Sequence, residues 1–356
     1  TFAIRAHTVS VAVNGGTGSG TVTSLPTGIN APTTPAAAYA YGTTVTLTAS
    51  ATAGSNFTGW SLAGCPGVGS CDVFVDGAKS VTATFTLQQL TLAVTKTGTS
   101  TNLGTVTSTP AGISCGATCS AGFSFNQSVQ LAATTMPGVV FLGWSGEGCA
   151  GTGSCSVTMS QARNVSAAFE GDKTLTVALN GTGTGTVVST PAGVSAPGDT
   201  TEAYPHGTMV TLTATATAAT SNFAGWAGTC TGAMTSCTVT MDQARSVTAT
   251  FNLKTYTLTL NKAGAGVGTV TSDVTGISCG TACATQSATY NHGQVVVLSQ
   301  LAGADSQFVA WGGSCSGATC SLTMTADRTV SADFKRTDKT LTVTVAGTGA
   351  GTVTSM

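Results

Sequence analysis

Apolar and polar residues alternate along most of the chain, and Thr and Val are prominent in the pattern. The alternation is clear in TLTVALN (174–180), TLTLNKA (257–263) and GTMVTLTATA (207–216). A period of two predicts β-strands with one buried and one exposed face, and the Gly-rich segments between such runs predict hairpin turns. Because no segment has a convincing 3.6-residue period, we expect an all-β protein.

The pattern recurs at a fixed period, which is marked by a phrase containing Trp. The phrase reads FTGWSLAGCPGVGSC (57–71), FLGWSGEGCAGTGSC (141–155), FAGWAGTCTGAMTSC (223–237) and FVAWGGSCSGATC (308–320). The tryptophans are 84, 82 and 85 residues apart, which predicts a tandem array of about four and a half small modules of about 83 residues. Each period holds an opening hairpin, a longer strand, the Trp phrase, a short strand and a closing strand, so we expect about five strands per module.

This period divides the chain into four repeats and part of a fifth. The predicted boundaries are 1–87, 88–171, 172–254 and 255–337, followed by the first hairpin of a truncated fifth repeat at 338–356. Thr1 and Phe2 match the end of a closing strand at Thr84 and Phe85, so we expect the chain to be a window on a longer array. The alternative is that a neighbouring chain completes the last hairpin, because an unpaired edge invites strand addition. Few residues join one repeat to the next, and we therefore expect an elongated, semi-rigid rod.

Twelve cysteines fall into six pairs at short spacing. The pairs are Cys65/Cys71, Cys115/Cys119, Cys149/Cys155, Cys230/Cys237, Cys279/Cys283 and Cys315/Cys320. An even number of cysteines in local pairs, in a Thr- and Gly-rich chain, predicts disulfides formed in an oxidising compartment. Zinc is the alternative, but a structural zinc site needs four ligands, and the first and third Trp phrases have two cysteines and no nearby His. We expect no metal site.

The loop after the first hairpin differs between odd and even modules. It contains a pair of cysteines in ISCGATC (113–119) and ISCGTAC (277–283), but none in INAPTTP (29–35) and VSAPGDT (194–200). We therefore expect odd and even modules to present different faces, which would give the array a period of two modules.

Each module has three recurring aromatic residues: a Trp, a Phe three residues before it, and a Phe that ends the closing strand. They are Phe57, Trp60 and Phe85; Phe141, Trp144 and Phe169; Phe223, Trp226 and Phe251; and Phe308, Trp311 and Phe334. A domain of this size buries only about 60–65% of its unfolded surface, so we expect these large side chains to form the core and local disulfides to stabilise it. The alternative is an exposed aromatic platform for a glycan, although Glu147 is the one acidic residue near any copy of the phrase.

The composition restricts the possible partners. Only 7% of the residues are charged and the net charge is −1, which argues against nucleic acid, because that ligand requires a basic surface. No apolar run approaches the 18 residues expected of a membrane-spanning helix. A surface of Thr, Ser, Gly and Asn with cysteine pairs favours an extracellular or cell-surface location.

The residues that carry chemistry elsewhere do not form a repeated catalytic pattern. His206 and His292 occupy corresponding turns and, like His7, are not grouped with Ser and Asp in any repeated way. No carboxylate pair, phosphate-binding loop or calcium loop recurs, so we expect no enzyme, no cofactor and no catalytic residue. A basic residue precedes each closing strand, often near an Asp, and we expect local surface salt bridges there rather than ligand contacts. These basic residues are Lys79, Arg163, Arg245 and Arg328, and the nearby acids are Asp76, Asp242 and Asp327.

Taken together, these motifs resemble a known family. The unit TLTVALNGTGTGTVVSTPAG…GTMVTLTATATAATSNFAGWAGTC…CTVTMDQARSVTATF is similar to the divergent InlB B-repeats of bacterial surface proteins, and the similarity covers the four repeats and the partial fifth. The resemblance implies a small β-rich, β-grasp-like module strung in tandem on secreted or cell-surface proteins, with no catalytic residues. It also implies a broad range of roles: stalk, adhesin segment, or accessory module of a larger exoprotein.

We therefore expect a non-enzymatic extracellular structural protein that forms a stalk or a self-assembling surface filament of a bacterium. Its main partner would be itself, through head-to-tail or lateral assembly, because a low net charge removes the repulsion between copies. The alternatives are an adhesin or glycan-binding repeat region that contacts surface glycans or matrix, and an accessory module of a larger secreted enzyme.

Overall fold

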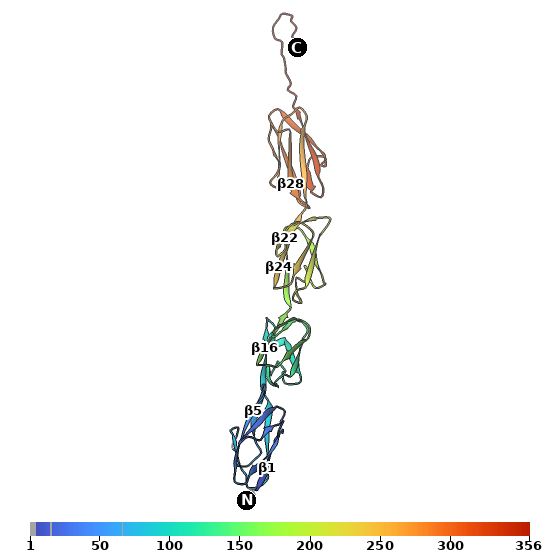
Figure 1. Ribbon diagram of the computed structural model, residues 1–356. Coiled ribbons are helices and arrows are strands. Elements are labelled where there is room, and N and C mark those ends of the chain that lie inside the picture. The colour runs from blue at the N-terminus through green and yellow to red at the C-terminus, as the bar shows by residue number, and fades with distance from the viewer. Residues whose placement is uncertain (1–4, 15, 66) are drawn as a thin grey trace. The chain divides into compact units, whose positions relative to one another are not determined.

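The computed structural model describes residues 5–14, 16–65 and 67–356, and Figure 1 shows successive modules built almost entirely of β-strands. Thr1 and Phe2, which match the end of a closing strand, lie outside the described residues. The chain divides into two compact units: residues 1–173 with 204–207, and residues 174–203 with 208–356. Each unit contains two modules, apart from the short segment 204–207 that groups with the first unit.

The first unit carries modules 1 and 2. Module 1 comprises β1 (Ala6–Val13), β2 (Gly20–Leu25), β3 (Asn30–Ala31), β4 (Ala36–Ala40), β5 (Thr44–Ala51), β6 (Ser55–Trp60), β7 (Cys71–Phe74) and β8 (Lys79–Leu87). Module 2 comprises β9 (Gln89–Thr97), the 3-10 helix η1 (Thr101–Leu103), β10 (Gly104–Thr109), β11 (Ser120–Ser124), β12 (Ser128–Thr135), β13 (Val139–Gly146), β14 (Cys149–Gly151), β15 (Cys155–Thr158) and β16 (Arg163–Gly171).

The second unit carries modules 3 and 4. Module 3 comprises β17 (Lys173–Asn180), β18 (Gly185–Thr190), β19 (Ser195–Ala196), β20 (Thr201–Tyr204), β21 (Met209–Ala216), β22 (Ser221–Gly228), β23 (Ser236–Thr240) and β24 (Arg245–Leu253). Module 4 comprises β25 (Thr255–Ala263), β26 (Gly268–Ser272), β27 (Ser278–Cys279), β28 (Thr285–Asn291), β29 (Val295–Ala302), β30 (Ser306–Gly313), β31 (Cys320–Thr323) and β32 (Arg328–Arg336).

Each module is two sheets packed face to face, with eight strands where the sequence predicts about five. The predicted opening hairpin is wrong, because the first two strands of each module, such as β17 and β18, lie in different sheets and do not pair. In module 3 the first sheet has the order β20-β17-β24-β22 and the second has the order β19-β18-β21-β23, and modules 1 and 4 repeat this arrangement. Module 2 differs only at the edges, where β14 extends the first sheet and the second sheet is reduced to β10-β12-β15. The fold is therefore an all-β tandem array, as the alternation predicts, with eight strands in each module.

The opening and closing strands of each module pair in parallel at the centre of the first sheet. In module 3, β17 pairs with β24 from Leu175↔Arg245 to Asn180↔Thr250, and modules 1, 2 and 4 contain the same parallel pair. The pairings of β18 with β21, of β21 with β23 and of β22 with β24 are antiparallel. Because the two central strands run in the same direction, the chain enters a module at one end of this sheet and leaves at the other.

The core lies between the two sheets and follows the alternation of the sequence. In β2, Gly20, Val22 and Ser24 point inward while the intervening residues face solvent. Ser24 is a buried polar residue, and its Oγ accepts a hydrogen bond from the Ile29 amide at 2.9 Å and lies 2.8 Å from the Tyr39 hydroxyl. The same Ser in modules 2 and 4, Ser108 and Ser272, accepts a bond from the amide five residues later, so this Ser fixes the loop that follows the second strand.

No strand is assigned to residues 337–356, where the sequence predicts the first hairpin of a fifth repeat. The alternating apolar residues Leu341, Val343 and Val345 are exposed there. In module 3 the corresponding strand is held by β24, which lies some 70 residues later in the sequence.

Candidate functional site

The three recurring aromatic residues come together in every module. The closing Phe lies opposite the first Phe on paired strands, as in Phe223↔Phe251, with ring centroids 5.1–5.5 Å apart in the four modules. The first Phe also contacts the Trp, with centroids 4.9–5.2 Å apart. These are edge-on or tilted contacts, the geometry that aromatic rings prefer.

The closing Phe side chains are the most deeply buried of the three, with at most 1% of their surface exposed. Trp144, Trp226 and Trp311 are also buried, at 4–6% exposure, while Trp60 and the first Phe of each module are half-buried. The indole Nε1 of Trp144 donates to the Gly153 carbonyl at 2.8 Å. The indoles of Trp60 and Trp226 make the matching bonds to the Gly69 and Met234 carbonyls. Burial therefore leaves little of the Trp144, Trp226 and Trp311 side chains exposed to solvent.

A Gly-rich turn encloses the closing Phe. In module 3 an ideal Cβ placed on Gly185 would lie 2.3 Å from Phe251 Cε1, and one placed on Gly181 would lie 2.0 Å from the Phe251 carbonyl oxygen. Gly181 also has a φ of +98°, which favours glycine. The equivalent residues of the other modules approach their closing Phe equally closely. The glycines of the connection between β17 and β18 are therefore required by close packing around one aromatic residue.

All six predicted cysteine pairs are disulfide-bonded in the structure, and no cysteine among the described residues is free. Four of the bonds close the loop that follows the Trp strand, and the second cysteine of that loop opens the next short strand in modules 1, 2 and 4. The other two, Cys115–Cys119 and Cys279–Cys283, close the loop after the second strand in the even modules. Among the described residues no group of three His, Cys, Asp or Glu side chains could hold a metal ion.

In modules 1, 2 and 3 the loop after the second strand is closed by the same pair of backbone hydrogen bonds, with or without a disulfide. In module 1 the amides of Asn30 and Thr34 each donate to the carbonyl of the other, and in module 2 Ser114 and Thr118 do the same. The buried position inside this loop is Ala31 in module 1, Cys115 in module 2, and Ala and Cys again in modules 3 and 4. The odd modules thus close the loop by backbone hydrogen bonds alone, module 2 adds a disulfide to them, and module 4 closes the loop with a disulfide.

The basic residue before each closing strand has a different partner from module to module. Lys79 and Arg245 pair with the acid three residues before them, Asp76 and Asp242, at 2.6 and 2.5 Å, as the sequence predicts. Arg163 instead pairs with Glu147, which belongs to the Trp phrase. In module 4 the prediction is wrong: Arg328 bonds the Thr325 hydroxyl, and Asp327 accepts the Thr257 amide. Each hydrogen bond from the base lowers the pKa of the paired Asp76 or Asp242 carboxyl.

A further ion pair in module 2 was not predicted. Glu170 accepts hydrogen bonds from Lys173 Nζ at 2.7 Å and from the Thr99 amide and hydroxyl. These bonds, that from Lys173 foremost, lower the pKa of Glu170 to about 2. The Glu170–Lys173 pair has the same three-residue spacing as the predicted pairs, but no local pattern reveals the Thr99 contact, because Thr99 and Glu170 are 71 residues apart and come together only when β9 pairs with β16.

The histidines occupy turns or strand ends. His7 contacts the Tyr41 ring and His292 contacts the Tyr256 ring, with centroids 6.1 and 5.9 Å apart. His206 lies in the turn after β20, in the position that corresponds to His292.

The recurring geometry matches a known repeat. The sequence profile of the divergent InlB B-repeat domain matches residues 9–89, 90–173, 175–255 and 256–338, which together make up most of the chain. The chain belongs to this family. Each InlB B-repeat of the chain corresponds to one two-sheet module, with the Trp phrase and the closing Phe at the same place in each.

Several solved structures align with this InlB B-repeat chain at low sequence identity and low TM-score. The TIE protein of Bacillus anthracis matches over 95% of this chain and 76% of its own, at 8% identity and a TM-score of 0.36. The minor pilin GBS52 of Streptococcus agalactiae matches over 49% of this chain and all of its own, at 8% identity and a TM-score of 0.21. The shaft pilin SpaA of Lactobacillus rhamnosus GG matches over 48% of this chain and 100% of its own, at 8% identity and a TM-score of 0.19. No curated protein sequence matches the chain, so its assignment rests on the InlB B-repeat profile.

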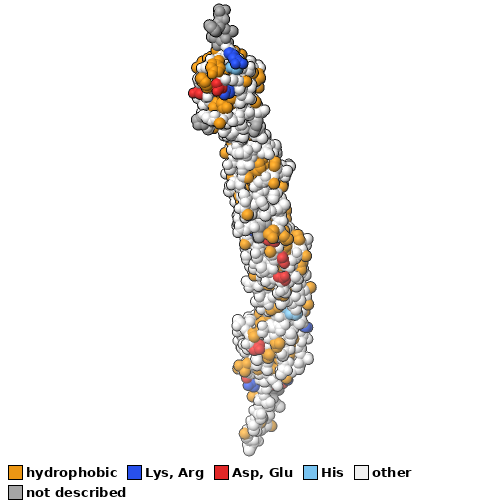
Figure 2. All heavy atoms as spheres, turned by 90° about the horizontal axis from the view of Figure 1, so that it is seen from below, with side chains coloured by type: hydrophobic (Ala, Val, Ile, Leu, Met, Phe, Trp, Pro, Cys, Tyr) orange, Lys and Arg blue, Asp and Glu red, His pale blue; other side chains and the backbone are white. Residues whose placement is uncertain are grey.

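The surface of the InlB B-repeats has few charges. Figure 2 shows a face on which neutral polar side chains and backbone predominate, with acidic and basic side chains in small, separate groups. The exposed face of β18, β21 and β23 in module 3 is built from Thr and Ser with Val188 and Met209, and it carries no charged residue. Within the described residues no helix has the length and hydropathy needed to cross a bilayer.

Proposed function

We propose that this InlB B-repeat chain is a tension-bearing segment of a non-enzymatic bacterial surface protein, acting in a stalk or a self-assembling filament outside the cell. Family membership supports an extracellular role, and so do the six disulfides, which form and persist in oxidising compartments. The low net charge of −1 supports close approach of neighbouring copies, because little electrostatic repulsion keeps them apart.

The parallel pairing of the first and last strands carries the proposal. When a module is pulled by its ends, the force acts along β17 and β24 in opposite directions, because the chain enters at the start of one and leaves at the end of the other. All the hydrogen bonds between the two strands are then loaded together. An antiparallel hairpin pulled from its open end would instead lose its bonds one after another. The same pair recurs in all four modules, so each would resist tension in the same way.

Single-molecule force spectroscopy tests this proposal. The chain, attached through its ends under non-reducing conditions, is expected to give four unfolding events at similar high force, one for each module. Reduction of the disulfides should increase the contour length released in each unfolding event. It should change the unfolding force little, because Cys230–Cys237 and its equivalents lie outside the parallel pair. Unfolding at the low force that separates a hairpin strand by strand would contradict a tension-bearing role.

A further inference from the structure

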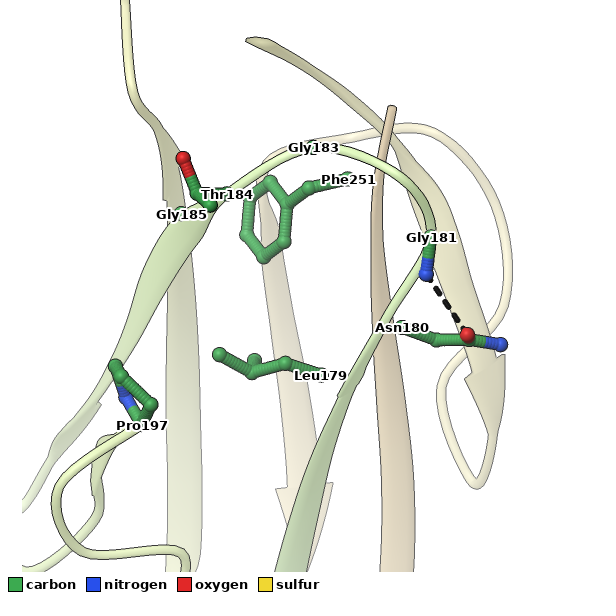
Figure 3. A pocket seen from close by; sticks show the side chains of 8 residues that line it. All are labelled: Leu179, Asn180, Gly181, Gly183, Thr184, Gly185, Pro197 and Phe251. Atoms are coloured by element: carbon green, nitrogen blue, oxygen red, sulfur yellow. Dashed lines mark hydrogen bonds between the residues drawn. The ribbon is translucent and has the colours of Figure 1, made fainter. Parts of the chain in front are cut away.

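The turn between β17 and β18 in module 3 brings an asparagine side chain onto the backbone of the next residue. Asn180 ends β17, and Gly181 follows it with a φ of +98°. Figure 3 shows the Asn180 side chain beside the Gly181 amide, which donates a hydrogen bond to Asn180 Oδ1 at 2.8 Å. Because Oδ1 is bonded to Cγ, this bond holds the side-chain carbonyl carbon close to the Gly181 nitrogen.

A nitrogen and a carbonyl carbon in this position can react with each other without a catalyst. The main-chain nitrogen that follows an asparagine loses its proton to water or hydroxide and attacks the asparagine Cγ. The N–Cγ bond forms and the Cγ–Nδ2 bond breaks, and the leaving group takes up a proton and departs as ammonia. The product is a five-membered succinimide ring. A side chain on the following residue hinders this approach, whereas glycine has no Cβ.

Both residues of the pair are open to solvent. Asn180 and Gly181 are exposed, so water reaches the Gly181 amide and the released ammonia can diffuse away. The sequence has one other Asn–Gly pair, Asn14–Gly15, at the corresponding turn of module 1, where Gly15 lies outside the described residues. The odd modules therefore share this pair in their sequences, and module 3 shows its geometry.

The even modules have a similar turn without the asparagine. Thr97–Gly98 in module 2 and Ala263–Gly264 in module 4 occupy the corresponding positions, and their glycines have φ values of +96° and +86°. In modules 2, 3 and 4 a Cβ on this glycine would lie 2.0–2.1 Å from the carbonyl oxygen of the closing Phe. The three turns therefore pack alike, and the asparagine of module 3 adds a reactive carbonyl group.

We propose that Asn180 is a site of spontaneous deamidation, in which the Gly181 nitrogen is the nucleophile and water is the co-reactant. Water opens the succinimide at either carbonyl: attack at Cγ gives aspartate, and attack at the main-chain carbonyl carbon gives isoaspartate, in which the chain runs through Cβ and Cγ. Either product has a carboxylate in place of a neutral amide, so each event adds one negative charge to a chain whose net charge is −1. Because ammonia is lost, the modification accumulates with the age of each copy.

Isoaspartate lengthens the main chain where the turn is closely packed. The Gly183 amide donates to the Phe251 carbonyl at 2.8 Å, and a Cβ on Gly183 would lie 2.6 Å from the carbonyl carbon of Asn252. An extra methylene group immediately before Gly181 would therefore displace the turn from Phe251 and break this hydrogen bond. Aspartate keeps the length of the main chain, and its carboxylate still accepts the Gly181 amide.

The first test incubates the intact, oxidised chain at neutral pH and follows each asparagine by peptide mapping and mass spectrometry that distinguishes aspartate from isoaspartate. Asn180 should convert to both products at least about tenfold faster than Asn126, which is exposed but is followed by Gln127. The matched control is N180Q, which should stay unmodified at this position because its longer side chain would have to close a six-membered ring. Conversion of Asn180 no faster than that of Asn126 would overturn the proposal.

The contribution of the fold is tested by comparing the folded chain with the chain unfolded in urea. The folded chain should convert Asn180 at least as fast, because the hydrogen bond to Gly181 already brings the reacting atoms together. Slower conversion in the folded chain would show that the turn protects Asn180 and would contradict the proposal.

Hydrogen exchange of the purified isoaspartate form tests the effect on the turn. The Gly183 amide should exchange faster than in the parent chain, while Gly266 of module 4, which makes the same bond to Phe334, stays unchanged. Equal protection of Gly183 in the two forms would refute the displacement of the turn.

Discussion

The ring of Phe251 lies directly against the backbone of Gly185, so closely that a methyl group on that glycine would lie 2.3 Å from the ring. Phe251 lies two residues before the end of β24, the closing strand of module 3, and Gly185 begins β18, 66 residues earlier. The contact joins the two sheets at the centre of the module, and the same pair recurs as Gly20–Phe85, Gly104–Phe169 and Gly268–Phe334.

We therefore expect G185A to destabilise module 3 by about 1–3 kcal/mol, the usual range for overpacking a close-packed core. Hydrogen exchange, followed separately for each module, measures the loss of stability. The amides of module 3 should exchange faster in G185A, while the exchange rates in module 1 stay unchanged. The matched control is G77A, because a Cβ on Gly77 would have no neighbour within 4 Å. Equal protection in G185A and the parent chain would show that the Phe251 ring can move aside.

The disulfides should contribute unequally to the modules. Each closes a short loop, and chain entropy predicts about 2 kcal/mol for each bond. Modules 2 and 4 contain two disulfides and modules 1 and 3 contain one, so reduction should destabilise the even modules about twice as much. Hydrogen exchange before and after reduction, with alkylation of the thiols, compares them within one chain. An equal loss of stability in odd and even modules would show that the second disulfide of modules 2 and 4 adds no stability.

The ion pair of Glu170 predicts acid sensitivity confined to module 2. Its pKa is lowered from 4.5 to about 2, so the ionised carboxylate is favoured in the folded state. The stabilisation is complete above the unfolded pKa of 4.5 and is lost as the pH falls from there towards 2. Carbon-detected NMR titration of the Glu170 carboxyl measures the value directly. K173M should raise this pKa because it removes the principal hydrogen bond, and an unchanged titration would show that Thr99 suffices.

The burial of the indoles predicts weak collisional quenching. Trp144, Trp226 and Trp311 are at most 6% exposed, and only Trp60 is half-buried. Iodide should therefore quench a minor part of the tryptophan fluorescence of the oxidised chain, and W60F should remove most of that part. Strong quenching that persists in W60F would place the other indoles at the surface and favour the aromatic platform for glycans.

Sequence patterns alone predict much of this architecture. The period of the Trp phrase and the strict alternation predict an all-β tandem array, and the structure confirms it. Local spacing also matches the bonded cysteine pairs. The two-sheet construction was missed because strands of two residues, such as β3 and β19, carry no measurable periodicity. The parallel pairing of Leu175 with Arg245 was missed as well, since it joins residues 70 positions apart and no local pattern encodes it.

The buried polar and glycine positions needed the structure for a different reason. Alternation places Ser24 on the inward face of β2, where a hydroxyl is unexpected, and only the folded loop supplies the Ile29 amide that it bonds. Likewise the glycines between β17 and β18 appear in sequence as a simple turn. Their requirement for close contact with the closing Phe depends on a strand at the far end of the module.

The measurement that tests the central claim most directly is immunogold electron microscopy of intact cells of the producing bacterium, with antibodies against module 3. An extracellular structural role predicts label on unpermeabilised cells, along filaments or stalks that project from the envelope. Label that appears only after permeabilisation would contradict that role.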